Sequence, residues 1–206
     1  MNTKNYPGKL FILSGPSGAG KGTICKGLLA QTDLQLSISM TTRKPREGEV
    51  HGVHYFFVSE DDFVARINEG GFLEHAQVYG NRYGTPKGPV VDKLKEGIDV
   101  ILEIDIQGAL KVKENYPDGV FIFILPPSMS ELRKRLTGRG TETPEAIELR
   151  LGETLKELSF IEKYDYCVVN GELDEAVARV KAIVIAEHSK VTMTAQEIVA
   201  KYKEEE

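Results

Sequence analysis

The chain has 206 residues and a mass of 22.9 kDa, and 41% of its side chains are hydrophobic while 28% are charged. This composition excludes a disordered, collagen-like or disulfide-stabilised protein. A folded chain of this size buries roughly 70% of its unfolded surface, which leaves room for one core with a small additional lobe. The net charge of −5 argues against a protein that binds nucleic acid or an anionic membrane over its whole surface, so a phosphate ligand needs a focused pocket.

The apolar runs of the sequence are short. No apolar run approaches the ~18 residues that a membrane span needs, and the run at residues 10–13 is too short for the core of a signal peptide. We therefore expect a soluble, cytoplasmic protein that binds neither nucleic acid nor membrane.

Cys25 and Cys167 lie among apolar neighbours without metal-ligand spacing, so both are interpreted as buried, reduced thiols.

Strand-like and helix-like segments alternate along the chain, which indicates a layered α/β fold and a single domain over residues 1–206. The first expected strand covers residues 9–14, and after a glycine-rich turn a helix continues to about Gln31. Leu34, Leu36 and Ile38 then alternate as in a strand.

A small mixed α/β lobe is expected at about residues 34–90, inserted into a core made of residues 8–33 and 91–206. Within the lobe, a capping box at Ser59 opens a short helix that Gly70 and Gly71 stop. The remaining lobe segments are a polar stretch at 41–52, an apolar one at 53–58, a strand at 72–79 and a loop at 80–84.

The second half of the chain contains the expected central strands. Residues 98–105 and 120–125 are almost continuously apolar, as in strands covered on both faces, and 166–169 is the last expected strand. Capping residues Ser128 and Thr143 begin two helices on either side of a glycine- and threonine-rich hinge. One long helix is expected from Leu173 to about Lys203.

A phosphate-binding motif stands between the first strand and the first helix. It reads Gly15-Pro16-Ser17-Gly18-Ala19-Gly20-Lys21. The glycines let successive backbone N–H groups turn toward one anion, the helix start adds partial positive charge, and the lysine supplies a full charge, as in a triphosphate site. The generic motif has Ser or Thr directly after the lysine to contact a magnesium ion, whereas here Gly22 occupies that place and Thr23 comes next.

Further blocks follow in a fixed order. They read Thr41-Thr42-Arg43-Lys44-Pro45-Arg46-Glu47-Gly48-Glu49, then Gly52, Tyr55-Phe56-Phe57, Gly80-Asn81-Arg82-Tyr83-Gly84-Thr85, Ile104-Asp105-Ile106-Gln107-Gly108, and Arg135 through Arg139-Gly140. Together they resemble the guanylate kinase family over about residues 10–170. The resemblance implies a P-loop NTPase core with a parallel sheet flanked by helices, a GMP-binding lobe, and a short lid at about 137–144 that closes over ATP.

The resemblance assigns ATP contacts to the motif residues 15–23, including Gly22 and Thr23, and to Asn170 near adenine. It assigns the GMP phosphate to Arg43, Arg46, Tyr55 and Tyr83, and the guanine side to Ser39, Glu74 and Thr85. Arginine forks match phosphate oxygens, and a carboxylate can accept both N–H donors of guanine. The rival interpretations are a solvated basic loop for the arginines, simple packing for the aromatic residues, and a structural role for Glu74.

The strand expected at 98–105 contains two carboxylates at its C-terminal end. Glu103 and Asp105 are two residues apart and therefore face the same side, near the end of the strand where ligands of open α/β sheets bind. The resemblance places both near GMP, and Asp105 near magnesium through water, although the family usually has Asp in place of Glu103. The plainer interpretation is an ordinary acidic strand end.

The resemblance directs Arg135, Arg139 and Arg150 at the transferred phosphate, where positive charge stabilises the equatorial oxygens. Together with Lys21 they are the expected catalytic residues, while an exposed ion-pair helix is the alternative. The implied activity is Mg²⁺-dependent transfer of the γ-phosphoryl group of ATP to GMP, and to dGMP, in purine nucleotide metabolism, by a monomer or homodimer. A non-catalytic interaction module and a P-loop kinase for another phosphorylated acceptor remain the alternatives.

Overall fold

The computed structural model describes residues 7–78, 80–138, 143–191 and 195–204. Its larger sheet has five parallel strands in the order β2-β7-β1-β8-β9. These strands are β1 (Leu10–Ser14), β2 (Gln35–Leu36), β7 (Val100–Glu103), β8 (Val120–Leu125) and β9 (Tyr166–Val169). The chain builds the sheet outward in both directions from β1, so the loop after β1 lies at the switch point where such sheets bind ligands.

Helices cover both faces of this sheet because its central strands are apolar on both sides. On β1, Phe11 and Leu13 pack toward α1 (Lys21–Leu29) and α7 (Leu173–His188), while Leu10 and Ile12 pack toward α3 (Lys87–Lys95) and α4 (Ile106–Asn115). Successive strand residues point to opposite faces, so one strand supplies both hydrophobic clusters. The predicted parallel sheet flanked by helices is confirmed.

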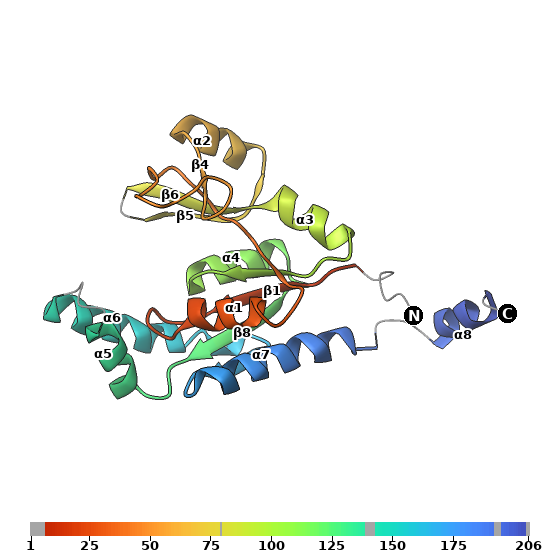
Figure 1. Cartoon of the computed structure of the whole chain (residues 1–206). Helices are drawn as coiled ribbons and strands as arrows, with labels where there is room; N and C mark the ends of the chain where they lie inside the picture. The colour runs from red at the N-terminus through yellow and green to blue at the C-terminus, as the bar shows by residue number, and fades with distance from the viewer. Residues whose placement is uncertain (1–6, 79, 139–142, 192–194, 205–206) are drawn as a thin grey trace.

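A second sheet of four strands, in the order β4-β3-β6-β5, lies beside the core together with α2 (Glu60–Asn68) (Figure 1). Its strands are β3 (Met40–Thr41), β4 (Phe56–Phe57), β5 (Phe72–Val78) and β6 (Asn81–Pro86). The side chains of Phe63 and Phe72 stack with ring centroids 4.5 Å apart and form its small core with Met40. Ser59 caps α2 by accepting the N–H of Asp62, as its capping box predicts.

Two expectations about the lobe are wrong. Residues 80–84 do not form a loop, because Asn81–Pro86 is β6 and pairs antiparallel with β5. The turn-forming residues Gly80, Asn81 and Gly84 suggested a loop, but the neighbouring strand supplies the pairing. Gln35–Leu36, placed in the lobe by its expected boundary at 34, is instead the edge strand β2 of the core sheet and pairs with β7.

The expected helices after β8 begin at their predicted caps. α5 (Met129–Thr137) begins after Ser128, which accepts the N–H of Glu131, and α6 (Pro144–Leu158) begins after Thr143, which accepts the N–H of Ala146. Of the predicted lid at 137–144, residues 139–142 lie outside the described part of the chain. A short 3₁₀ helix, Ile161–Lys163, leads into β9.

The single C-terminal helix expected over 173–203 is two helices, α7 (Leu173–His188) and α8 (Ala195–Glu204). At the end of α7, Lys190 folds back to Glu187 at 2.6 Å, and Ser189 Oγ donates to the carbonyl of Ile185 at 3.1 Å. Among the residues described here, no helix is long and apolar enough to cross a membrane.

The two cysteines differ in exposure. Cys25 in α1 is buried as expected, and burial raises the pKa of its thiol to about 12. Cys167 is exposed, contrary to the expectation, because β9 is the edge strand of the sheet. Apolar sequence neighbours alone could not distinguish an edge strand from a central one.

Candidate active site

The glycine-rich loop joins β1 to α1 and has a backbone that only glycine adopts without strain. Gly15 has φ +147°, and a Cβ there would lie 2.3 Å from the carbonyl oxygen of Ile124. Gly20 has φ +91°, and a Cβ there would lie 2.2 Å from Nδ2 of Asn170. A side chain at either position would therefore both strain the backbone and collide with the neighbouring strand ends.

Lys21 is the first residue of α1, whose first turn contains no acidic residue. Its Nζ donates to the carbonyl oxygens of Gly15 at 2.6 Å and Pro16 at 3.0 Å. The ammonium group is thus folded over the loop, at the positive end of the helix dipole. This combination of backbone amides and a fixed ammonium group suits a polyphosphate.

Three residues predicted from the second half of the chain reach the same loop. Asn170, which follows β9, donates its Nδ2 to the carbonyl oxygen of Ala19 at 2.8 Å. Arg135 in α5 donates to the carbonyl oxygen of Asn170 at 3.0 Å and to Glu131 at 3.1 Å. Arg150 in α6 donates to Ser17 Oγ at 2.8 Å. The fourth predicted residue of this set, Arg139, lies outside the described residues.

The second half of the site is a hollow of about 260 Å³ between the lobe sheet and the end of β7. It is lined by Ser39, Tyr55, Glu74, Ala76, Tyr83, Gly84, Glu103, Ile104 and Asp105. Most residues that the sequence assigned to the GMP site are therefore brought together here. Of the others, Thr85 contacts Glu74, Arg43 contacts Tyr55, and the exposed Arg46 follows in the same loop.

Glu74 is a buried carboxylate that is held by Thr85 in this hollow. Thr85 Oγ1 donates to its Oε1 at 2.8 Å, and both residues are buried. Burial raises the pKa of Glu74, the Thr85 bond opposes that rise, and nearby Asp105 adds to it. A carboxylate held in this way is a strong acceptor for a ligand that brings N–H donors.

Arg43 stands at the rim, above aromatic side chains. Its guanidinium carbon lies 5.5 Å from the ring centroid of Tyr55 and 5.7 Å from that of Phe57. The rings of Tyr55 and Tyr83 are 6.1 Å apart. A guanidinium group beside two phenol groups is an arrangement that recognises phosphate oxygens.

Glu103 connects the two halves of the site. It lines the hollow, and a Cβ on Gly22 would lie 3.2 Å from its Oε1. Burial raises the pKa of Glu103 and the nearby charge of Lys21 lowers it in part. The absence of a side chain at residue 22 therefore leaves room for this carboxylate beside the loop.

Asp105 has a structural contact as well as a place in the hollow. Its Oδ1 accepts the N–H of Gly108 at 2.7 Å and so caps α4. Thr23, in the first turn of α1, is exposed. Within the described ranges no group of three or more His, Cys, Asp or Glu side chains could hold a metal ion by itself.

Comparison with known proteins agrees with this geometry. The family model described as guanylate kinase matches residues 7–187. The chain belongs to the guanylate kinase family. Guanylate kinase from Clostridium acetobutylicum is 55% identical over 184 residues, which is 89% of this chain and 88% of the relative. The same enzyme from Caldanaerobacter subterraneus is 58% identical over 185 residues, 89% of this chain and 90% of the relative.

A solved structure shows the same fold. The crystal structure of guanylate kinase from Anaplasma phagocytophilum superimposes with a TM-score of 0.72 at 37% identity, covering 90% of this chain and 89% of that one. Membership of the guanylate kinase family therefore rests on sequence and structure alike, and it makes the chain an ATP:GMP phosphotransferase.

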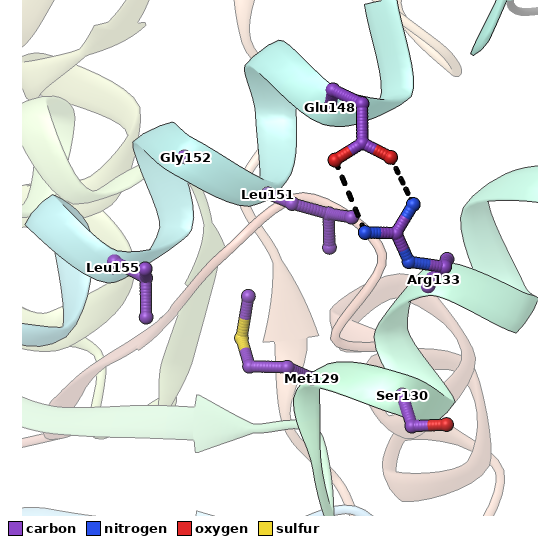
Figure 2. Close-up of a pocket in the computed structure, with 7 residues that line it drawn as sticks. All are labelled: Met129, Ser130, Arg133, Glu148, Leu151, Gly152 and Leu155. Carbon is purple, nitrogen blue, oxygen red and sulfur yellow. Dashed lines mark hydrogen bonds and ion pairs between the residues drawn. The ribbon is translucent and has the colours of Figure 1, made fainter.

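A second and larger hollow, of about 490 Å³, lies between α5 and α6 (Figure 2). It is lined by Met129, Ser130, Arg133, Glu148, Leu151, Gly152 and Leu155. The guanidinium of Arg133 makes a two-pronged ion pair with Glu148 across the two helices. None of the residues assigned to the guanylate kinase site lines this second hollow. The smaller hollow is therefore the candidate active site.

Sequence reasoning missed several residues of the guanylate kinase site. Ala76, Gly84 and Ile104 line the hollow, but their side chains carry no chemical signal. Glu49 was part of a recognised block without an assigned role, and it accepts hydrogen bonds from Arg43 and from the backbone of Arg46. Its contacts could have been anticipated from its spacing, because Glu49 follows Arg46 by three residues and Arg43 by six.

Proposed function

We propose that the two halves of the site hold two nucleotides end to end, ATP on the glycine-rich loop and GMP in the hollow, so that the γ-phosphoryl group passes directly to the GMP phosphate. The observation that carries this assignment is the position of Glu103. Its carboxylate lines the hollow and also lies beside Gly22 of the loop, so the two binding regions adjoin.

On the donor side, the loop amides and Lys21 bind the β- and γ-phosphates of ATP. Arg135 and Arg150 already contact the loop and its neighbour Asn170, which brings their positive charge to the phosphates. Asn170 holds the loop backbone through Ala19 and lies toward the adenine end. Arg139 completes the set of arginines. Charge in these positions counts most in the transition state, as the bond to the leaving oxygen loosens.

On the acceptor side, the carboxylate of Glu74 accepts the N1–H and N2–H donors of guanine, and the hydroxyls of Ser39 and Thr85 serve the remaining polar atoms. Arg43, Arg46, Tyr55 and Tyr83 bind the phosphate. Adenine has no N1–H donor for the carboxylate, so with AMP the buried Glu74 would keep its bond from Thr85 but lack the paired donors that guanine supplies. The hollow therefore selects guanine.

Catalysis needs no nucleophilic side chain, because the acceptor phosphate is already an anion near neutral pH. The chain's task is to align the two phosphates, neutralise their charge and exclude water. Lys21 and the arginines provide the neutralisation, and the lobe provides the alignment.

The residues present fit a magnesium ion bound mainly through ATP. Mg²⁺ keeps several waters and takes one or two carboxylates besides phosphate oxygens, which agrees with two acidic residues at one strand end and no larger acidic cluster in the described ranges. Thr23, Asp105 and Glu103 would hold it, the carboxylates through water. When bound, it would supply charge neutralisation at the ATP phosphates.

The test is release of ADP from Mg-ATP with GMP, AMP, CMP and UMP as acceptors, on the full chain and on Glu74→Gln. GMP should be the preferred acceptor, and Glu74→Gln should lose most of that preference. Equal rates with AMP and GMP would contradict the guanine assignment. Binding of GMP without ADP release from any acceptor would instead support a non-catalytic module.

A further inference from the structure

Glu49 makes a two-pronged contact with the loop that contains both predicted phosphate-binding arginines. Its Oε1 accepts from Nη2 of Arg43 at 2.8 Å, and its Oε2 accepts the backbone N–H of Arg46 at 2.7 Å. The N–H of Glu49 donates in turn to the carbonyl oxygen of Arg46 at 3.1 Å. One carboxylate therefore ties the Arg43 side chain to the backbone turn that carries Arg46.

These contacts leave Arg43 fixed from several sides. Nη1 donates to the carbonyl oxygen of Lys44 at 2.8 Å, and the guanidinium lies against the rings of Tyr55 and Phe57. Only 14% of the Arg43 side chain and 19% of the Glu49 side chain are exposed. A guanidinium group carries five N–H donors, so donors remain for phosphate oxygens after these contacts.

The Glu49 carboxylate stays ionised throughout the neutral range. Hydrogen bonding to Arg43, and next to the backbone of Arg46, lowers its pKa to about 2. Hydrogen bonding to Glu49 likewise raises the pKa of Arg43. Both members of the pair therefore keep their charges across the neutral range, so this ion pair does not depend on pH there.

We propose that Glu49 is a positioning residue for the acceptor phosphate, holding the guanidinium of Arg43 and the turn at Arg46 in the arrangement that receives it. This inference rests on the proposed function, in which Arg43 binds the GMP phosphate. A long arginine side chain that is already ordered loses less conformational freedom when the phosphate binds. Glu49 itself touches neither nucleotide.

Electrostatic repulsion alone predicts the opposite effect of Glu49 on GMP binding. Glu49 places a negative charge beside a site for an anion, so a carboxylate that only diluted the positive charge would weaken phosphate binding. Removal of Glu49 would then tighten the binding of GMP. The sign of the change therefore distinguishes positioning from electrostatic competition.

The experiment measures the dissociation constants of GMP and ATP by calorimetry for Glu49→Ala, Glu49→Gln and the control Glu47→Ala, which removes an exposed carboxylate from the same loop. We expect Glu49→Ala to weaken GMP binding about tenfold, as for loss of a hydrogen bond to a charged group, with ATP binding unchanged. Glu49→Gln keeps one acceptor oxygen and should fall between Glu49→Ala and the wild type, and Glu47→Ala should match the wild type. Unchanged or tighter GMP binding in both Glu49 variants would overturn the proposal.

A double-mutant cycle with Arg43→Ala shows whether Glu49 acts through Arg43. In the Arg43→Ala background, Glu49→Ala should weaken GMP binding much less than it does in the wild type. An equal loss in both backgrounds would mean that Glu49 does not act through Arg43, and its role in positioning that guanidinium would be wrong. If Arg43→Ala alone leaves GMP binding intact, the phosphate assignment in the proposed function fails instead, and the inference fails with it.

Thermal unfolding of each variant shows whether a change in GMP affinity comes from misfolding. If Glu49→Ala lowers the melting temperature enough to leave unfolded chains at the assay temperature, Glu49→Gln carries the same cycle with one of the two acceptor contacts preserved. A selective change in the affinity for GMP with an unchanged affinity for ATP is a readout that a general loss of structure would not produce.

Discussion

The hydroxyl of Thr85 donates to Oε1 of Glu74 at 2.8 Å, and both side chains are buried. Oε2 of the same carboxylate lies toward α4, where a Cβ on Gly108 would be 3.3 Å away. The lobe strands β5 and β6 thus hold a nearly enclosed carboxylate against the core helix that follows β7. This arrangement determines how the acceptor site should respond to pH.

Binding of GMP should weaken as the pH falls through the pKa of Glu74, because only the ionised carboxylate accepts both guanine donors. Burial raises that pKa above 4.5 and the Thr85 bond opposes the rise. Thr85→Val removes the opposing bond and should move the acid limb of GMP affinity to higher pH. Calorimetric titrations across the acidic range measure this shift, and superimposable profiles for the two proteins would count against it.

Glu74 should also affect the stability of the ligand-free chain. Its pKa in the folded state lies above that of an ordinary glutamate, so folding favours the protonated form. Its contribution is fully present below about pH 4.5 and is lost as the pH rises through the folded pKa. The unfolding free energy of wild type relative to Glu74→Gln should therefore fall over this interval in denaturant titrations. A difference that grows with pH would contradict the sign.

Lys21→Ala should lower kcat by about a hundredfold or more, since one preorganised donor to developing charge contributes this much. The fold should survive, because the Lys21 ammonium bonds to loop carbonyls and the residue belongs to neither hydrophobic cluster of the core sheet. Lys26→Ala, at an exposed position in the same helix, is the control. Full activity of Lys21→Ala would remove the lysine from the mechanism.

Asn170→Ala should weaken ATP binding and cost about 1–3 kcal/mol of stability, because it leaves the Ala19 carbonyl without its donor. Asn115 provides a matched comparison, since its Nδ2 donates to the carbonyl oxygen of Leu73 at 2.9 Å away from the loop. Asn115→Ala should lose stability without a change in the KM for ATP. Equal effects of the two variants on that KM would show that the Asn170 contact has no specific role.

Asp105 combines a helix cap with a place in the hollow, and two substitutions separate these contributions. Asp105→Asn removes the charge but keeps a good N-cap, so activity should fall while stability stays near that of the wild type. Asp105→Ala should lose the same activity and about 1 kcal/mol of stability as well. Chemical denaturation and initial rates measure both effects. Normal activity of Asp105→Asn would leave Asp105 only its role as a cap.

Several strands and helix caps could be predicted because their signals are local. The apolar runs at Val120–Leu125 and Tyr166–Val169 have the predicted bounds, and Ser59, Ser128 and Thr143 cap the helices that follow them. Features set by distant partners were missed. β6 exists because β5 pairs with it, and the exposure of Cys167 follows from the place of β9 at the sheet edge.

The candidate site shows the same difference between features with a local sequence signal and features set by distant parts of the chain. The loop and the ordered blocks named most of the residues that the structure brings together. The placement of Glu103 beside Gly22 and the bond from Arg135 to the backbone of Asn170 bring together segments far apart in the chain. The anchoring of Arg43 by Glu49 lies within one recognised block, but it depends on how that loop folds back on itself.

Calorimetry on the 206-residue chain is the most direct test of the central claim that the lobe hollow holds a guanine nucleotide while the loop holds ATP. GMP should give a saturable heat, AMP should give none at the same concentrations, and Arg43→Ala or Glu74→Gln should each weaken the GMP signal without affecting ATP. Normal binding of ATP with no heat from GMP, or equal binding of AMP and GMP, would contradict the account.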